Sequence, residues 1–322
     1  MKAFFILASA MTAAVPAGAG APVLGLPIAC ELGETCWVQQ YADHDPSAGV
    51  ADYACGTETY DGHDGTDIRV RDTSSDAQVI ASTAGTVKAI RDGVADRLMQ
   101  SEADRAAVQD RECGNGVVID HGGGWETQYC HLRRGSVAVK PGDMVERGAK
   151  LGTVGYSGMA AFPHVHLTVR KDGKAIDPFH RPDTSVCGLV DPLWADDVLP
   201  ALAYRQGSII GFGFAPGAVA MPQLEDGSTA ALTPSGDWPA MVAYLWAINL
   251  LGGDVVTVSL TGPDGIAASK SVTLDRAKAQ YMLFAGKKQP PSGWPQGNYE
   301  GRITIGSGGA ARLSQQWRFS LR

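Results

Sequence analysis

Apolar and polar side chains alternate along one short run of the sequence, Pro163-His164-Val165-His166-Leu167-Thr168-Val169. Alternate side chains of a β-strand share a face, so the run predicts a strand that directs Val165, Leu167 and Val169 into a core. His164 and His166 then project together from the other face, with Cβ atoms about 6–7 Å apart. One imidazole of such a pair can bind a metal ion while its neighbour faces a substrate. Two surface histidines on an exposed strand are an equal alternative.

Working outward, the next candidate segment is rich in glycine and polar residues: Tyr60-Asp61-Gly62-His63-Asp64-Gly65-Thr66-Asp67-Ile68. The glycines exclude an ordinary helix, so a turn must bring His63 and Asp67 together. Imidazole nitrogen and carboxylate oxygen are both good zinc ligands, near 2.0–2.2 Å. With one histidine of the first run they complete a His-His-Asp set whose open fourth position is typical of catalytic zinc. Taken alone, the two residues indicate a turn stabilised by hydrogen bonds.

A third segment lies at the end of a predicted β-hairpin. Its first strand is Val117-Val118-Ile119-Asp120, its turn is His121-Gly122-Gly123-Gly124, and its second strand runs from Trp125 to Leu132. In the second strand we expect Trp125, Thr127, Tyr129 and His131 to alternate onto one face. A lone histidine here would ordinarily be structural.

Length and composition set the frame around these segments. At about 150 residues per domain, 322 residues predict two domains, with one large all-β domain as the competitor. Forty glycines and 18 prolines favour many tight turns over a helical bundle. The formal net charge of −7 speaks against a nucleic-acid or anionic-membrane binder.

The N-terminus reads as an export signal. Met1 and Lys2 precede a short apolar run and an alanine-rich stretch that ends in Ala17-Gly18-Ala19. We therefore predict a signal peptide over residues 1–19 and export to the periplasm or, alternatively, to the extracellular space. Removal of Lys2 changes the net charge from −7 to −8. We expect no membrane anchor on the mature chain.

All six cysteines lie beyond that leader, at positions 30, 36, 55, 113, 130 and 187. An even number in an exported protein favours disulfides, and the absence of a Cys-x-x-Cys pair argues against a structural zinc site. Six cysteines allow fifteen pairings. The pairs we favour are Cys30–Cys36 as a short loop, Cys113–Cys130 across the hairpin, and Cys55–Cys187 by elimination.

The sequence changes character beyond about residue 193. Seven short strand-like runs follow one another, at Ser208–Phe214, Met241–Ile248, Val255–Leu260, Ala267–Leu274, Ala279–Phe284, Tyr299–Ile305 and Leu313–Leu321. Seven such strands within about 120 residues predict an immunoglobulin-like β-sandwich, and we assign it no chemistry. In the first half, Asp92–Glu112 is charged and almost free of glycine, so we expect an inserted loop or short helix that borders the site.

The three histidine-bearing segments occur together in a known order. His63-x-Gly65-x-Asp67, Tyr129-x-His131-Leu132 and Gly155-x-Ser157-Gly158…His164-x-His166 resemble the motifs of lysostaphin/LytM-type zinc endopeptidases. The turns Asn115-Gly116-Val117-Val118-Ile119-x-His121 and Pro141-Gly142-Asp143-x-Val145-x-x-Gly148 are also similar to those of that family, and the resemblance covers roughly residues 59–180.

This resemblance implies a small antiparallel β fold, the duplicated hybrid motif, and hydrolysis of peptide bonds in bacterial peptidoglycan. By position, His63, Asp67 and His166 are then the zinc ligands, one zinc ion per chain. His131 and His164 match the two catalytic histidines that do not bind the metal. Tyr60 or Tyr129 could supply a further hydrogen bond. The remaining histidines, His44, His121 and His180, are expected to be solvated or structural.

The resulting prediction is a mainly β protein in four parts. These are the signal peptide (1–19), a disulfide-bearing N-terminal arm (20–58), a zinc endopeptidase domain (59–190) and a β-sandwich accessory domain (195–322). Its substrate would be peptidoglycan peptides, and the sandwich could receive a regulatory protein partner. The alternatives are a catalytically latent regulator of other cell-wall hydrolases and a wall-binding protein of the same fold.

Overall fold

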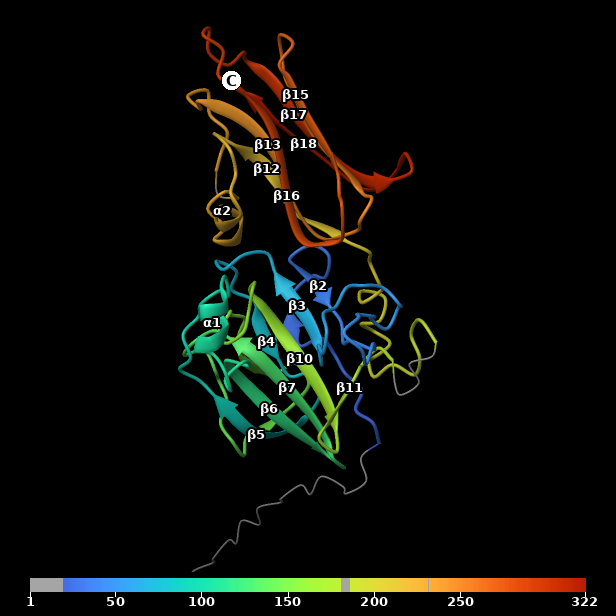
Figure 1. Ribbon diagram of the computed structural model, residues 1–322. Helices are drawn as coiled ribbons and strands as arrows, with labels where there is room; N and C mark the ends of the chain where they lie inside the picture. Colours follow the sequence, from blue (N-terminus) through green and yellow to red (C-terminus); the bar gives the residue numbers. More distant parts are fainter. Residues whose placement is uncertain (1–19, 181–185, 231) are drawn as a thin grey trace, which may run out of the picture.

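The computed structural model describes residues 20–180, 186–230 and 232–322. The signal peptide predicted for residues 1–19 lies outside these ranges. Within them the chain is mainly β, with one group of sheets below and a second group above in the view of Figure 1. No helix in the described part of the chain is long and apolar enough to cross a membrane.

The lower group is built on an eight-stranded antiparallel sheet in the order β2-β3-β10-β7-β6-β5-β8, with β11 paired to β10. Its strands are β2 (Cys36–Gln40), β3 (Thr66–Val70), β5 (Gly85–Arg91), β6 (Asn115–Gly122), β7 (Trp125–Leu132), β8 (Met144–Val145), β10 (His164–Lys171) and β11 (Lys174–Ile176). A smaller sheet contains β1 (Ile28–Ala29), β4 (Gln78–Ile80) and β9 (Lys150–Thr153). The predicted hairpin is β6 and β7.

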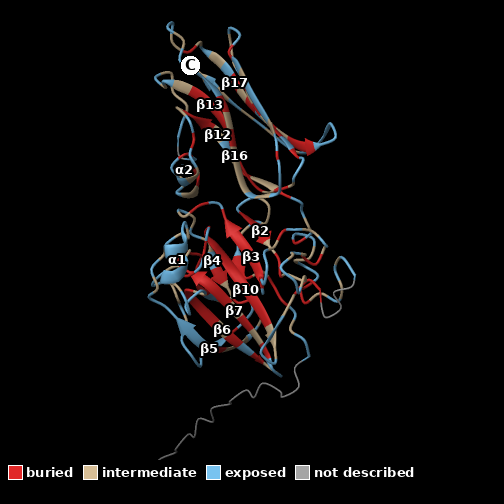
Figure 2. Cartoon of the chain, viewed as in Figure 1, coloured by how far each residue is buried: buried red, intermediate tan, exposed pale blue. Residues whose placement is uncertain are grey.

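The core of this group lies on the face of β10 that the alternation predicts. Val165, Leu167 and Val169 are fully buried in one apolar cluster. Figure 2 shows burial concentrated in the centre of the sheet, in β3, β10, β7 and β6. His164 and His166 are also buried, 4% and 8% exposed, so the alternative of two surface histidines on an exposed strand is wrong.

Residues 20–58 belong to the same core. Strand β2 pairs with β3, and Leu24, Ile28, Tyr41 and Tyr53 pack into the apolar cluster of the main sheet. All three favoured disulfides are confirmed: Cys30–Cys36, Cys55–Cys187 and Cys113–Cys130.

The upper group consists of two antiparallel sheets, with strands in the orders β12-β13-β16 and β15-β14-β17-β18. Their bounds are β12 (Ser208–Ala215), β13 (Ala240–Leu250), β14 (Val255–Thr261), β15 (Ala267–Thr273), β16 (Lys278–Lys288), β17 (Gly297–Ser307) and β18 (Ala310–Leu321). Each overlaps one of the seven predicted strands. Side chains from both sheets share one apolar cluster. We call these strands the C-terminal sheet pair.

The inserted segment is a loop that carries the short helix α1 (Glu102–Ala107), as expected. Ser101 caps this helix by accepting a hydrogen bond from the backbone NH of Asp104. The segment packs along the loop that precedes β10: the Met99 NH donates to the Ala160 carbonyl at 2.9 Å. It therefore lies beside the loop that leads into the strand with His164 and His166.

The two groups of sheets meet through a third apolar cluster. Strand β13 is buried on both faces, which explains why its sequence is apolar from Ala240 to Ile248. One face joins the core of the C-terminal sheet pair, while Tyr244 and Trp246 on the other pack with Trp37 of β2. Helix α2 (Met221–Glu225) contributes Leu224 to the same cluster.

Arg69 of β3 crosses this junction. Its side chain is 0% exposed, and its guanidinium lies 4.9 Å from the ring centre of Phe162 and 5.0 Å from that of Trp246. Nη1 donates to Gln39 Oε1 at 2.7 Å and to Gln280 Oε1 of β16 at 3.1 Å. Because a buried charge requires partners, these contacts tie the main sheet to the C-terminal sheet pair.

Replacement of this arginine by lysine tests the junction. Lysine keeps a charge but cannot reproduce the planar stacking or the forked hydrogen bonds, so Arg69→Lys should lower the free energy of unfolding by roughly 2–4 kcal/mol. Urea denaturation measures this. The control Arg302→Lys, at an exposed position of β17, should change stability by less than about 0.5 kcal/mol. Equal, small effects would contradict a structural role for Arg69.

Glu58 gives the junction a pH dependence. Its Oε1 accepts the Gly207 NH at 3.1 Å, while Oε2 has no hydrogen-bond partner among the described residues. Burial is the main cause that raises the pKa of Glu58 to about 8, from an ordinary value of 4.5. The nearby Asp52 raises this pKa further, whereas hydrogen bonds from Gly207 and Asn249 and the charge of Arg312 lower it.

A raised folded-state pKa means that the folded protein holds the proton more tightly than the unfolded chain does. The resulting stability is complete below pH 4.5 and is lost as the pH rises through 8. Glu58→Gln should remove this slope and be more stable than the natural protein at pH 9, by roughly 1–3 kcal/mol. Thermal unfolding from pH 5 to pH 9 measures it, with exposed Glu146→Gln as the control. An unchanged slope in Glu58→Gln would refute the assignment.

Candidate metal centre

The pairing of β3 with β10 builds the site. In this antiparallel register Asp67 stands opposite His166, and Arg69 stands opposite His164. Side chains directly opposite one another share a face of the sheet, so the carboxylate of Asp67 and both imidazoles of the His-Val-His run lie on one side. His63 reaches the same side from the turn before β3, where its NH donates to the Tyr60 carbonyl at 3.0 Å.

Three donor atoms converge at this point. His63 Nε2 lies 3.2 Å from Asp67 Oδ1 and 3.1 Å from His166 Nδ1, and His166 Nδ1 lies 2.8 Å from Asp67 Oδ1. Ligand atoms at 2.0–2.1 Å from a tetrahedral metal ion would be about 3.3 Å apart. Small outward shifts would therefore admit an ion, and these three residues are the group that could hold one in the described part of the chain.

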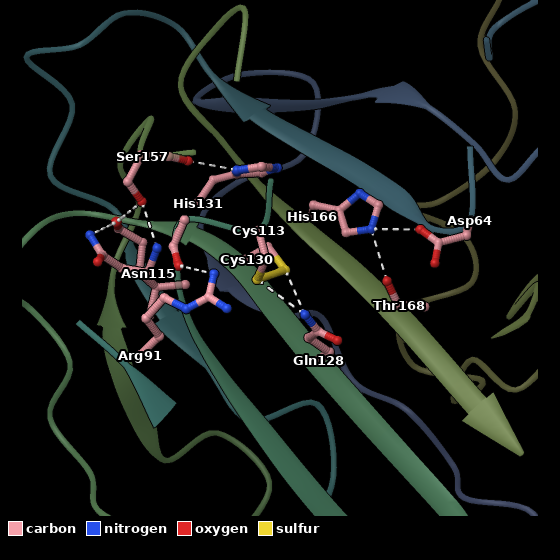
Figure 3. Close-up of a disulfide and its surroundings, with 12 residues drawn as sticks. Asp64, Arg91, Cys113, Asn115, Gln128, Cys130, His131, Ser157, His166 and Thr168 are labelled. Carbon is pink, nitrogen blue, oxygen red and sulfur yellow. Dashed lines mark hydrogen bonds and ion pairs between the residues drawn. A yellow bond between two sulfur atoms is a disulfide. The ribbon is translucent and has the colours of Figure 1, made fainter. Parts of the chain in front are cut away.

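The far nitrogens of the two histidines are already engaged, so the near nitrogens are the ones that can bind an ion. His63 Nδ1 donates to the Tyr41 carbonyl at 2.6 Å. His166 Nε2 donates to Thr168 Oγ1 at 2.8 Å and lies 3.3 Å from an oxygen of Asp64 (Figure 3). Such outer hydrogen bonds fix the tautomer and orientation of metal-binding histidines, so this donor set fits a metal ion.

The charges at the three-residue group also suit a cation. Burial acts to raise the pKa of Asp67, but the neighbouring His63 and His164 and the hydrogen bond from His166 outweigh it and hold this pKa well below its usual range. Burial likewise opposes protonation of His166, yet Asp64 and Asp67 raise its pKa to about 9. A metal ion must displace that proton, so acid weakens metal binding.

His131 and His164 lie beside the three-residue group, and the Nδ1 atom of each is held by a hydrogen bond. His131 Nδ1 donates to the Ser157 carbonyl at 2.8 Å (Figure 3), and His164 Nδ1 donates to the Phe162 carbonyl at 2.8 Å. Their ring centres are 4.5 Å apart. Burial is the main cause that lowers both pKa values, that of His131 to well below its usual range. Both imidazoles are therefore neutral near pH 7, with a lone pair on Nε2.

The expected alternation of β7 is wrong at its end. Trp125 and Tyr129 point into the core of the main sheet, so strict alternation would bury His131 there as well. Instead His131 has a φ of 64°, which turns its side chain to the opposite face, toward His164. This left-handed conformation is uncommon outside glycine. The Cys113–Cys130 disulfide and the hydrogen bond from the His131 NH to the Cys113 carbonyl hold the chain there.

The other candidate residues differ in their distance from the site. Tyr60 contacts the His63 ring at 4.5 Å between centres, whereas the Tyr129 hydroxyl accepts the Ser82 NH on the far side of the sheet. His44, His121 and His180 lie outside the site, hydrogen-bonded to Asp177, to Ala84 and Thr127, and to Gly188 respectively. The sequence does not identify Tyr41, Asp64 and Thr168 as hydrogen-bond partners of the candidate ligands His63 and His166. Thr168 could have been found, because it shares a strand face with His166.

Two cavities adjoin the site. One, of about 500 Å³, is lined by His63, Asp64, His131 and His166. The other, of about 360 Å³, is lined by Asp67, His131 and His164 together with residues of the inserted segment and of β16. Both volumes are within the usual range of small-molecule and cofactor sites, about 300–1,000 Å³, so the buried histidines remain accessible to a ligand.

Comparison with known sequences identifies the family to which the segment that contains this site belongs. The profile described as peptidase family M23 matches residues 61–178, the segment that contains all five site residues. Residues 61–178 form an M23 domain. The resemblance to lysostaphin/LytM-type enzymes is thereby confirmed.

The M23 domain has relatives of several kinds. Over 116 residues, 36% of this chain, it is 29% identical to an uncharacterised metalloprotease of Haemophilus influenzae. Over 64 residues, 20% of this chain, it is 38% identical to the peptidoglycan DD-endopeptidase ShyA of Vibrio cholerae serotype O1. The matches span only 20% and 14% of the lengths of these two relatives.

Among solved structures, the catalytic domain of the prophage-encoded M23 protein EnpA from Enterococcus faecalis is similar. It is 22% identical, with a TM-score of 0.33, and the match covers 51% of this chain and 98% of that domain.

The outer hydrogen bond to His166 can be tested on its own. Thr168→Val removes the hydroxyl that accepts from His166 Nε2 while keeping the side-chain shape, so Zn²⁺ affinity should fall about tenfold or more. Competition with a chromophoric chelator measures this. Thr66→Val is the matched control, because the buried Thr66 hydroxyl on β3 has no hydrogen-bond partner among the described residues. Equal affinities for Thr168→Val and the natural protein would contradict the orienting role.

Proposed function

We propose that this protein is an exported zinc metalloendopeptidase that hydrolyses peptide bonds in peptidoglycan stem peptides or cross-links. One observation carries the proposal: His63 Nε2, Asp67 Oδ1 and His166 Nδ1 converge within 2.8–3.2 Å beside two neutral histidines. A two-histidine, one-carboxylate set suits zinc, and three protein ligands leave a position for water or substrate. The names of the relatives support peptidoglycan as the substrate.

The three proposed ligands have different roles at the metal. Zinc bound at this site would supply a Lewis acid that makes water nucleophilic near neutral pH and polarises the scissile carbonyl. His63 and His166 hold their metal-facing lone pairs in place through Tyr41 and Thr168. Asp67 contributes a negative charge that stabilises a cation bound at the centre.

The two remaining histidines handle protons. Hydrolysis needs a group that accepts a proton from the attacking water and later delivers one to the leaving amine nitrogen. His131 and His164 are neutral because they are buried, and each has its Nδ1–H fixed by a carbonyl. Nε2 of His164 lies 3.5 Å from Asp67 Oδ1, next to the metal-facing atoms. Once protonated, either imidazole can also donate to the oxygen that gains charge at the cleaved carbonyl.

Export rests on separate support. Three disulfides suit an oxidising compartment such as the periplasm. The signal peptide, the compartment and a regulatory protein partner for the C-terminal sheet pair stay predictions.

Cleavage of isolated peptidoglycan sacculi tests the function. The purified mature protein should release fragments with new free amino and carboxyl ends, detected by mass spectrometry. His166→Ala should lose both bound zinc and cleavage. His131→Ala should retain about one zinc ion per chain, yet cleave at least 100-fold more slowly, since a proton-transfer group contributes about 10²–10⁴.

His121→Ala provides a matched control, because this buried histidine hydrogen-bonds to Ala84 and Thr127, which lie outside the site. Full cleavage by metal-stripped protein would refute the zinc mechanism. Zinc binding without any cleavage would instead support the latent regulator or wall-binding protein.

A further inference from the structure

The two cavities beside the centre differ in charge. The larger one has three carboxylates in its lining, from Asp61, Asp64 and Glu112, and its Arg170 lies 3.8 Å from Asp64. Among the described residues that line the smaller one, the charged side chains are Asp67, which belongs to the metal centre, and Arg105. Away from the metal centre, the smaller cavity therefore offers a single positive charge.

Apolar groups make up much of the remaining wall of the smaller cavity. These residues share an apolar side chain, and they are Met99, Met159, Ala161, Phe162 and Ala279. A volume of about 360 Å³ corresponds to about twelve water molecules at 30 Å³ each. The cavity has room for a short peptide segment.

Arg105 is available to bind a ligand. Its side chain is 59% exposed, and its ion pair with Glu102 spans 3.4 Å, with Glu102 itself 92% exposed. Exposed pairs of this kind contribute little stability, so a better partner can replace Glu102. Arg105 Nη1 also lies 3.9 Å from Met159 Sδ, across the cavity lining. Guanidinium groups bind carboxylates through two parallel hydrogen bonds.

Another part of the cavity wall is held in place by the buried junction around Arg69. Gln39 and Gln280 both line the cavity, and both accept hydrogen bonds from Nη1 of Arg69. Nε2 of Gln39 also lies 3.5 Å from the Ala279 carbonyl. Strand β16 of the C-terminal sheet pair thus forms a firmly held part of the wall of a cavity that His131 and His164 also line.

We propose that this cavity is a substrate subsite, assembled from the M23 domain, the inserted segment and β16, in which Arg105 binds the terminal carboxylate of a short peptide segment. The inference rests on the peptidase function proposed above and adds the chemistry of the substrate on one side of the cleaved bond. It assigns a binding role to a helix outside the family motifs and to a strand of the C-terminal sheet pair.

The test compares two forms of one substrate. A synthetic peptide that spans the bond cut in muropeptides, and ends soon after it, is made with a free terminal carboxylate and as the terminal amide. Natural protein should show a KM about tenfold lower for the free acid. Arg105→Ala should raise KM for the acid about tenfold, with kcat within twofold, and leave the amide unaffected. Arg105→Lys should fall between them, because lysine keeps the charge without the fork.

Arg111→Ala is the matched control, since this exposed arginine of the inserted segment donates to the Ala107 carbonyl and is absent from both cavity linings. It should not change either KM. Ala279→Phe, which narrows the cavity from β16, should raise KM for both forms of the peptide without changing zinc affinity. Retained zinc affinity in every variant separates a binding defect from misfolding.

Binding of the released product peptide, as acid and as amide, is measured in parallel by calorimetry. Tighter binding of the acid, lost in Arg105→Ala, supports the subsite even if turnover is absent. Equal KM and equal binding of acid and amide would overturn the subsite while leaving the peptidase function intact. Absence of any cleavage by zinc-loaded natural protein would instead count against the peptidase function.

Discussion

The register of two adjacent strands sets everything else in the site. Pairing of β3 with β10 places Asp67 opposite His166 and Arg69 opposite His164. A shift of one residue would turn each of these side chains to the other face of the sheet, and would exchange them for Ile68, Val165 and Leu167 in the core. Burial of the apolar face therefore fixes the register of β3 and β10. The same register keeps the donor atoms on the polar face within 3.2 Å of one another.

Much of this was readable from local pattern. Strict alternation in His164–Val169 predicted which side chains enter the core, and seven runs with the same period anticipated β12–β18. The cysteine pairs followed from spacing, because two of them close short loops. Motif order identified the M23 domain. Each of these signals depends on residues close in sequence or on a fixed order of motifs. Such features can be recognised from the sequence alone.

The sequence left out what depends on distant contacts. His131 reaches the candidate site through a positive φ that alternation cannot predict, and it is held there by a disulfide and by the Cys113 carbonyl. Strand β2 looked like part of a separate arm, yet it pairs with β3. The C-terminal sheet pair carried no recognisable chemistry, but β16 lines a cavity of the site. No local propensity encodes that Gln39 and Gln280 both accept hydrogen bonds from Arg69.

Arg69 has a consequence for how this protein can be divided or recombined. Its charge sits between Phe162 of the M23 domain and Trp246 of β13, with no exposed surface. A segment cut to the family boundaries would carry that cation to a new surface without its second ring and without Gln280. The M23 domain of this chain is therefore poorly suited to transfer into other proteins on its own, because Arg69 would lose its partners. A chimera that keeps the candidate site intact should carry the C-terminal sheet pair with it.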